Sequence, residues 1–197
     1  MSSQFTFIIF GPSGSGKGTQ AHLLIDLLKK IDSERKVMYI ETGQRFREFA
    51  DSGSYTATLV KGVMSTGALL PEFLPIWMWT EILVHDFAGN ENIIFEGVSR
   101  REHEAPILDS AMRFYKRENP YVISINVSKE WATQRLNARG RYDDTPADII
   151  ERLNWYDKNV IPAIDFFKND PYYKILEING EQSIEDVHKE IVQKLGI

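Results

Sequence analysis

The sequence contains no cysteine, which excludes a disulfide scaffold, a thiolate metal site and a cysteine nucleophile. Positive charge is not in excess either, because 23 basic residues face 28 acidic ones, and the net charge of −5 argues against a nucleic-acid partner. No apolar stretch approaches the ~20 residues that span a bilayer. The apolar run at residues 5–10 has no Lys or Arg before it and ends at Gly11. We therefore expect no signal peptide, no membrane association and a cytoplasmic location.

The 197 residues suit one domain, and a content of 43% hydrophobic and 26% charged residues is ordinary for a globular protein. Five short apolar runs predict strands buried on both faces, at residues 5–10, 37–40, 92–95, 121–127 and 174–178. Segments with i, i+3, i+4, i+7 spacing separate these runs, the first marked by Ala21, Leu24, Ile25 and Leu28. We predict an α/β fold with a five-stranded parallel sheet flanked by helices.

The second and third predicted strands are separated by about fifty residues, far more than one crossover helix needs. This spacing predicts a helical insertion at about residues 43–70, followed by a long aromatic helix. Thr145 before Pro146, and Ser183 three residues before an aspartate, predict two helix starts. Pro162 lies inside the last long helical pattern and predicts a kink.

The strongest local signal is a glycine-rich loop between the first strand and the following helix, with the sequence GPSGSGKGT at residues 11–19. Glycines let successive backbone N–H groups converge on one phosphate, and the dipole of the following helix adds to the attraction. Lys17 supplies a full positive charge near the β- and γ-phosphates. Gly18 stands where the general pattern has Ser or Thr, and the hydroxyl follows at Thr19. The loop predicts binding of a nucleoside triphosphate or another phosphate.

Two further segments place charged side chains after predicted strands. Residues 42–47 read TGQRFR, and Arg47 falls where a guanidinium can form a bidentate fork with a phosphate. Glu96 follows the third apolar run, where a carboxylate orients magnesium beside a phosphate loop. Taken alone, the first segment is more typical of a surface helix with two arginines. Glu96 could be a strand-end carboxylate that faces solvent, but the apolar residues that precede it and the order along the chain favour the site.

Four arginines gather near residues 131–152, around the acidic pair Asp143 and Asp144, and these are Arg135, Arg139, Arg141 and Arg152. Such a cluster suits phosphoryl transfer, because the loose transition state carries negative charge on its equatorial oxygens. A segment that closes over the phosphates also excludes water, which would otherwise accept the phosphoryl group.

Together these segments resemble the adenylate kinase family. The loop reads GPSGSGKGTQA where the family has GxPGSGKGTQ, and residues 42–47 match TGxxxR. Residues 96–100 read EGVSR where the family has DGFPR, and residues 135–153 resemble RLxxRG…GRxDD…RL. The resemblance runs in the family's order from residue 5 to about residue 180. It implies a P-loop NTPase fold with a core (residues 1–42, 71–138 and 145–197), an insertion that binds the nucleoside monophosphate (NMP) at about 43–70 and a short lid at about 139–144.

The resemblance also implies roles for individual residues. ATP binding falls to Ser13, Gly14, Ser15, Gly16, Lys17, Gly18, Thr19 and Arg135. Binding of the acceptor falls to Thr42, Arg47, Leu70, Gly97, Arg100 and Glu104. Catalysis falls to Lys17, Arg100, Arg139, Arg141 and Arg152. Thr19 and Glu96 would hold Mg²⁺, the latter through water.

The choice of acceptor base is left open by the sequence, because the family has a glutamine where this chain has Glu104. An ionised carboxylate only accepts hydrogen bonds, so it takes the adenine amino group but faces the lone pair of the adjacent ring nitrogen. Guanine offers two neighbouring donors and suits a carboxylate better. Leu69 and Leu70 are expected to contact the acceptor base, although packing of a helix junction explains them equally well.

The resulting prediction is a monomeric nucleoside monophosphate kinase that catalyses ATP + AMP = 2 ADP with Mg²⁺, and whose partners are these nucleotides. The alternatives are a kinase for GMP or another small acceptor, a nucleotide-dependent switch, and an inactive family member. The chain lacks the NKxD string with which GTPase switches read their base. Phosphoryl transfer that depends on an acceptor distinguishes a kinase from a nucleotide-dependent switch and from an inactive family member.

Overall fold

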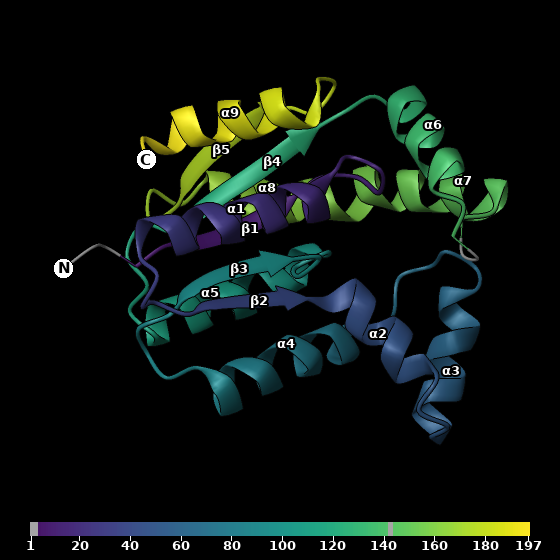
Figure 1. Ribbon diagram of the computed structural model, residues 1–197. Helices are drawn as coiled ribbons and strands as arrows, with labels where there is room; N and C mark the ends of the chain where they lie inside the picture. The colour runs from purple at the N-terminus through teal and green to yellow at the C-terminus, as the bar shows by residue number, and fades with distance from the viewer. Residues whose placement is uncertain (1–3, 142–143) are drawn as a thin grey trace.

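The computed structural model describes residues 4–141 and 144–197 (Figure 1). Its strands form one sheet in the order β2-β3-β1-β4-β5, and every neighbouring pair is parallel. The strands are β1 (Thr6–Phe10), β2 (Val37–Glu41), β3 (Asn92–Glu96), β4 (Tyr121–Asn126) and β5 (Lys174–Asn179). The predicted α/β fold with a five-stranded parallel sheet is confirmed, and each strand lies within a residue or two of its predicted bounds.

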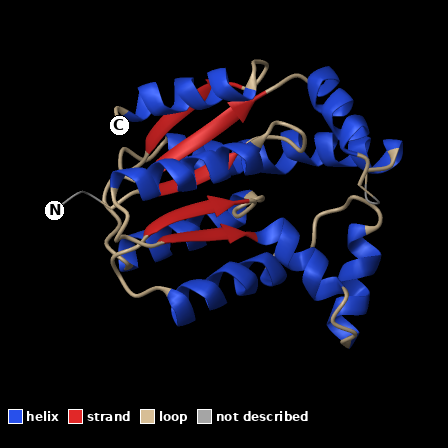
Figure 2. Ribbon diagram, in the orientation of Figure 1, coloured by secondary structure: helices blue, strands red, loops and turns tan. Residues whose placement is uncertain are grey.

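Helices cover both faces of the sheet, as the blue and red ribbons of Figure 2 show. They are α1 (Lys17–Ile31), α2 (Thr42–Ala50), α3 (Tyr55–Met64), α4 (Phe73–Asp86), α5 (Ala105–Phe114), α6 (Lys129–Arg139), α7 (Pro146–Trp155), α8 (Ile161–Lys168) and α9 (Ile184–Leu195). A short 3₁₀ turn (Glu102–Glu104) precedes α5. No helix of the described residues is both long and apolar enough to cross a membrane.

The central strand β1 divides the apolar core into two layers, because successive side chains of a strand point to opposite faces. Phe7 and Ile9 pack with α1 and α9 on one face. Ile8 and Phe10 pack with α4, α5 and α8 on the other face. The two layers fix the sheet between helices, so the loops at the carboxyl ends of its strands are held on a rigid frame.

Two helical segments extend the molecule beyond the carboxyl ends of the strands, α2–α3 and α6–α7 (Figure 1). The α2–α3 segment fills the long gap between β2 and β3 and has a small apolar cluster of its own with α4, which contains Phe46, Val60 and Leu74. This segment occupies the region in which the sequence predicted a helical insertion. Its assignment to acceptor binding is taken up below.

Local signals set the ends of the later helices. The Thr145 hydroxyl accepts a hydrogen bond from the backbone N–H of Asp148 (3.3 Å) and begins α7, and Ser183 caps α9 in the same way. A π-helical turn, Tyr156–Val160, lies directly before α8. Pro162 has no N–H with which to continue a regular helix from that turn, so the irregularity falls where the sequence predicted one.

Candidate active site

The glycine-rich loop joins β1 to α1 and has the curled backbone that a phosphate cradle needs. Gly14 (φ +87°) and Gly16 (φ +90°) both adopt the left-handed region. A Cβ atom at Gly14 would lie 2.7 Å from the Ala132 carbonyl oxygen of α6, so no other residue fits there. The Lys17 ammonium donates to the carbonyl oxygens of Gly11 (2.7 Å) and Pro12 (2.9 Å), which holds it inside the curl.

The loop forms one wall of a cavity of about 690 Å³. The other walls come from the ends of β2 and β3, from α2, from the segment after α3, and from α6 and α7. Every predicted site residue lines this cavity except Ser15, which is buried and whose hydroxyl has no hydrogen-bond partner among the described residues. Segments more than a hundred residues apart in sequence therefore converge on one space.

Electrostatics inside the cavity act on Lys17 from several sides. Burial lowers the pKa of Lys17 to about 8, and the negative charge of Glu96 offsets part of this effect. The cations Arg100 and Arg139 lower the pKa further. Cations that lower one another's pKa repel each other, so the site favours a ligand that brings negative charge. A polyphosphate is such a ligand.

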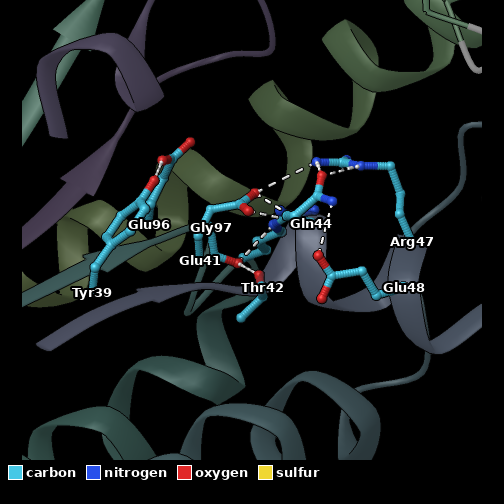
Figure 3. Close-up of polar contacts among 9 residues, drawn as sticks. Tyr39, Glu41, Thr42, Gln44, Arg47, Glu48, Glu96 and Gly97 are labelled. Carbon is cyan, nitrogen blue, oxygen red and sulfur yellow. Dashed lines mark hydrogen bonds and ion pairs between the residues drawn. The ribbon is translucent and has the colours of Figure 1, made fainter. Parts of the chain in front are cut away.

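The carboxyl ends of β2 and β3 bring two carboxylates together, because Glu41 and Glu96 are directly paired in the parallel register. The Tyr39 hydroxyl donates a hydrogen bond to Glu96 (Figure 3), and burial and the Glu96 charge raise the pKa of Tyr39. Both oxygens of Glu41 accept from the backbone N–H of Gln44 (2.9 Å), which caps α2. Burial and the charge of Glu96 raise the pKa of Glu41.

The predicted acceptor residues lie next to this pair. Arg47 donates to the Gln44 side-chain oxygen (2.9 and 3.1 Å), and its Nη2 atom lies 3.8 Å from Glu41 Oε1 (Figure 3). The Thr42 hydroxyl donates to the Gly97 carbonyl oxygen (2.7 Å), and Arg100 Nε donates to the same oxygen (2.8 Å). A shared carbonyl thus joins the start of α2 to Arg100.

Gly97 has a steric reason to be glycine. Its φ is +74°, and a Cβ there would lie 2.5 Å from the Arg100 guanidinium. Burial lowers the pKa of Arg100, and its guanidinium lies 5.9 Å from the centre of the Trp155 ring. Arg100 is therefore held from two sides, by the carbonyl of residue 97 and by an aromatic face of α7.

Asp144 links two of the predicted catalytic arginines. Arg139 donates to both of its carboxylate oxygens (2.7 and 2.8 Å), and Arg152 donates to one of them (2.8 Å). Burial alone would raise the pKa of Asp144, but the hydrogen bonds and charges of Arg139 and Arg152 hold it below its ordinary value. Arg141 lines the cavity as well. Asp143, the other member of the predicted acidic pair, lies outside the described residues.

Arg135 and Glu104 line the cavity from α6 and from the 3₁₀ turn before α5. The Arg135 guanidinium lies 4.9 Å from the centre of the Trp131 ring, one turn earlier on α6. Glu104 is buried (1% exposed), and its Oε2 accepts the backbone N–H of Arg100 (2.7 Å). Burial raises the pKa of Glu104. One carboxylate oxygen of Glu104 is therefore committed to the fold.

The donor set fits a magnesium site of the kind that relies on water and phosphate. Glu96 adjoins the first turn of α1, because a Cβ at Gly18 would lie 3.5 Å from its Oε2, and the exposed Thr19 follows on the same turn. Oxygen donors suit Mg²⁺, which keeps several water ligands. Among the described residues, no three or more His, Cys, Asp or Glu side chains form a group that could hold a metal ion. The described residues thus offer few direct ligands for a metal ion beside Glu96 and Thr19.

A glycine-rich loop after the first strand of a parallel sheet, in one cavity with a set of arginines, is typical of a P-loop phosphotransferase. Comparison with known sequences identifies the branch. The sequence model of the family described as adenylate kinase matches residues 9–172. The chain is 34% identical to an adenylate kinase of a Cyanothece species over 93% of this chain and 91% of the relative.

Further relatives agree. The chain is 31% identical to an adenylate kinase of Corynebacterium urealyticum over 91% of this chain and 93% of the relative. It is 30% identical to an adenylate kinase of Xanthomonas campestris over 96% of this chain and 98% of the relative. The chain therefore belongs to the adenylate kinase family. The predictions of a P-loop fold and of a nucleoside monophosphate kinase that transfers phosphoryl groups between ATP and AMP are confirmed.

Proposed function

We propose that the cavity binds MgATP and AMP together and that the residues predicted from sequence carry out the transfer between them. The observation that carries this proposal is the convergence of Lys17, Arg47 and Arg100 on one cavity with the arginines of α6 and α7. Two phosphate sites that open into the same space allow direct transfer. Positioning of this kind supplies much of the rate enhancement in phosphoryl transfer.

The donor phosphates lie on the glycine-rich loop in this proposal. The backbone N–H groups of residues 13–19 surround the β-phosphate, and Lys17 neutralises charge that develops between the β- and γ-phosphates. Arg135 lies on the outer side of the cavity with Trp131 and packs on the donor base. Mg²⁺, held by Thr19 and by Glu96 through water, would neutralise phosphate charge when bound.

The acceptor phosphate lies between Arg47 and Arg100 in this proposal. Both guanidinium groups lie near Gly43, where a Cβ would be 3.5 Å from Arg47 Nη1 and 3.7 Å from Arg100 Nη2. Thr42 and Leu70 contact the nucleobase of the acceptor nucleotide. The acceptor phosphate oxygen is already ionised at neutral pH, so no side chain has to remove a proton. Arg139, Arg141 and Arg152 stabilise the equatorial oxygens of the transferring group. The lid predicted at 139–144, of which residues 142 and 143 lie outside the described residues, serves in this proposal to exclude water.

The test is a coupled assay of ADP formation with MgATP and each of AMP, GMP, CMP, UMP and dTMP in turn. The proposal expects fast turnover with AMP and turnover lower by about two orders of magnitude or more with the other acceptors. Preference for GMP would make the enzyme a different nucleoside monophosphate kinase. Nucleotide consumption that does not depend on any acceptor would contradict the proposal.

We also propose that the enzyme acts as a cytoplasmic monomer. Both statements come from the sequence. Gel filtration combined with light scattering tests the oligomeric state, and a dimer at micromolar concentration would contradict it. Cell fractionation of the source organism tests the location, and recovery in the membrane or secreted fraction would contradict it.

A further inference from the structure

The buried carboxylate of Glu104 has one oxygen without a hydrogen bond. Oε2 accepts the backbone N–H of Arg100, but Oε1 is buried and has no hydrogen-bond partner among the described residues. Glu104 nevertheless lines the cavity. A buried carboxylate oxygen without a hydrogen bond is costly, so a ligand that supplies a donor at this point gains more than it would on an open surface.

Arg101 stands beside this oxygen. Its Nη1 atom lies 3.7 Å from Glu104 Oε1, which is too far for a direct hydrogen bond. The same Nη1 donates to the Leu70 carbonyl oxygen (2.6 Å), and Nη2 lies 3.5 Å from that of Leu69. A guanidinium has five N–H groups, so these two contacts leave further donors. The segment after α3 thus fixes the Arg101 guanidinium next to the Oε1 acceptor.

The surrounding wall suits a planar, largely apolar ring. Leu69 and Leu70 line the cavity, and so do three other apolar side chains, Phe46, Met64 and Pro75. A base between such walls loses its contacts with water, and its polar edge must then find partners in the protein. Glu104 and Arg101 are charged groups of this wall that lie beside Leu70.

The edge of adenine carries an amino donor next to a ring nitrogen acceptor. A carboxylate satisfies the donor but faces the ring nitrogen with a second lone pair. Glu104 and Arg101 together present one acceptor and one donor, so the pair offers on two side chains what an amide offers on one. Guanine seated the same way would place its carbonyl oxygen against Glu104 and its ring N–H against Arg101, a mismatch at both positions.

We propose that Arg101 and Glu104 act as a pair that selects adenine in the acceptor site, with Glu104 Oε1 accepting from the amino group and Arg101 donating to the adjacent ring nitrogen. This inference rests on the proposed function, because it assigns the base specificity of the same site. It adds Arg101, a residue that no sequence motif singled out. It also resolves the mismatch that Glu104 alone would leave with adenine.

The experiment compares kcat/KM for AMP and for GMP in the wild type, in Arg101→Met and in the double variant Arg101→Met/Glu104→Gln. The assays are run at about pH 8, because burial raises the pKa of Glu104 and a higher pH favours the ionised carboxylate. Arg45→Met is the matched control, since Arg45 is an exposed arginine of α2 that does not line the cavity. Thermal unfolding of each variant checks that it is folded.

We expect Arg101→Met to lower the ratio of kcat/KM for AMP to that for GMP by roughly 10- to 100-fold, because the carboxylate alone disfavours adenine. The ratio in the double variant should be at least about tenfold higher than in Arg101→Met, since the amide introduced by Glu104→Gln supplies the missing donor. Arg45→Met should leave the ratio unchanged.

Two results would overturn the inference. An equal loss with both acceptors in Arg101→Met would mean that the residue only holds the segment of Leu70 in place. No recovery in the double variant would mean that the missing donor is not the cause. Either result leaves the proposed function standing, whereas a wild type that transfers to no acceptor would refute the proposed function itself.

Discussion

The proposed donor and acceptor halves of the cavity are built in different ways. The proposed donor half is a single run of nine residues whose backbone is curled, with glycines at the positions where φ is positive. The acceptor half is assembled from side chains on α2, after β3 and on α7, including Arg47, Arg100 and Trp155. A site made from backbone has to keep its sequence pattern. A site made from side chains can exchange partners, as the proposed pairing of Glu104 with Arg101 would require.

The largest effect should come from the one charged side chain of the donor loop. We expect Lys17→Met to lower kcat by about 10³-fold or more, because the charge that develops on the phosphates loses its nearest cation. The midpoint of thermal unfolding should stay within a few degrees of the wild type. Lys129→Met, on an exposed residue paired with Asp157, is the control and should keep full activity. Unchanged turnover in Lys17→Met would show that the loop does not hold the reacting phosphates.

A variant at the amino ends of the strands should affect stability without affecting either half of the cavity. Arg117 is fully buried and donates to Thr6 Oγ1 (2.7 Å) and to the Phe5 carbonyl oxygen (2.9 Å). Arg117→Met removes the donor to Thr6 Oγ1 and one of the two donors to the Phe5 carbonyl oxygen, which keeps the backbone N–H of Ile93. We therefore expect a loss of roughly 1–3 kcal/mol in the free energy of unfolding. Denaturant unfolding measures this loss. A fall in kcat at a temperature where the variant is fully folded would contradict the separation of fold and chemistry.

The acceptor half and the lid should share a smaller dependence on Asp144. Asp144→Asn keeps the size of the side chain but weakens the bonds that hold Arg139 and Arg152 together. We expect kcat to fall by roughly 10- to 30-fold with KM for both nucleotides changed less, since one charge-assisted network is loosened rather than removed. Asp157→Asn, an exposed carboxylate of the π-helical turn, is the matched control. Equal kcat values in the two variants would show that the arginines do not depend on this carboxylate.

The pH profile should separate the two halves most finely, because arginines do not titrate in the accessible range and Lys17 does. The pKa of Lys17 is lowered to about 8, so the ammonium is charged below that pH and loses its proton above it. We expect kcat/KM for MgATP to fall as pH rises through about 8, up to about tenfold per pH unit, since this parameter reports the free enzyme. Lys17→Arg should have lower activity but no such fall. A wild-type profile that stays flat to about pH 10 would contradict the assignment.

The sequence predicted the parallel sheet well, because each strand depends on a pattern within one segment. Continuous apolar runs predicted all five strands, and the spacing between two of them predicted the position of α2 and α3. The cap residues Thr145 and Ser183 also act as predicted. For the strands and the caps, the signal and the structure it specifies lie within a few residues of each other.

The sequence missed features that arise only when distant segments meet. Tyr39 and Glu96 are 57 residues apart, and no local pattern indicates that the hydroxyl of one reaches the carboxylate of the other. Glu41 pairs with Glu96 only because β2 and β3 are neighbours in that register. Knowledge of the strand order would have indicated the second pair but not the first, whose contact depends on the conformations of the two side chains.

Glu104 illustrates the limit of a motif-based prediction. Its position correctly places it on the cavity wall, and the choice of base was left open because an isolated carboxylate suits guanine. The structure adds that one oxygen is bound to Arg100 and that Arg101 stands beside the other. The chemistry of the pair differs from the chemistry of either residue, so the sequence position alone could not assign the base.

The most direct test of the account follows the phosphoryl group itself. Wild-type enzyme is mixed with Mg²⁺, AMP and ATP that is radiolabelled in its γ-phosphate, and the products are separated at early times. Direct transfer within one cavity predicts that the label appears in ADP, in step with the loss of AMP, and that almost none appears as inorganic phosphate. Label released as inorganic phosphate at a rate independent of AMP would contradict the claim that the donor and acceptor sites face each other in a closed, water-excluding site.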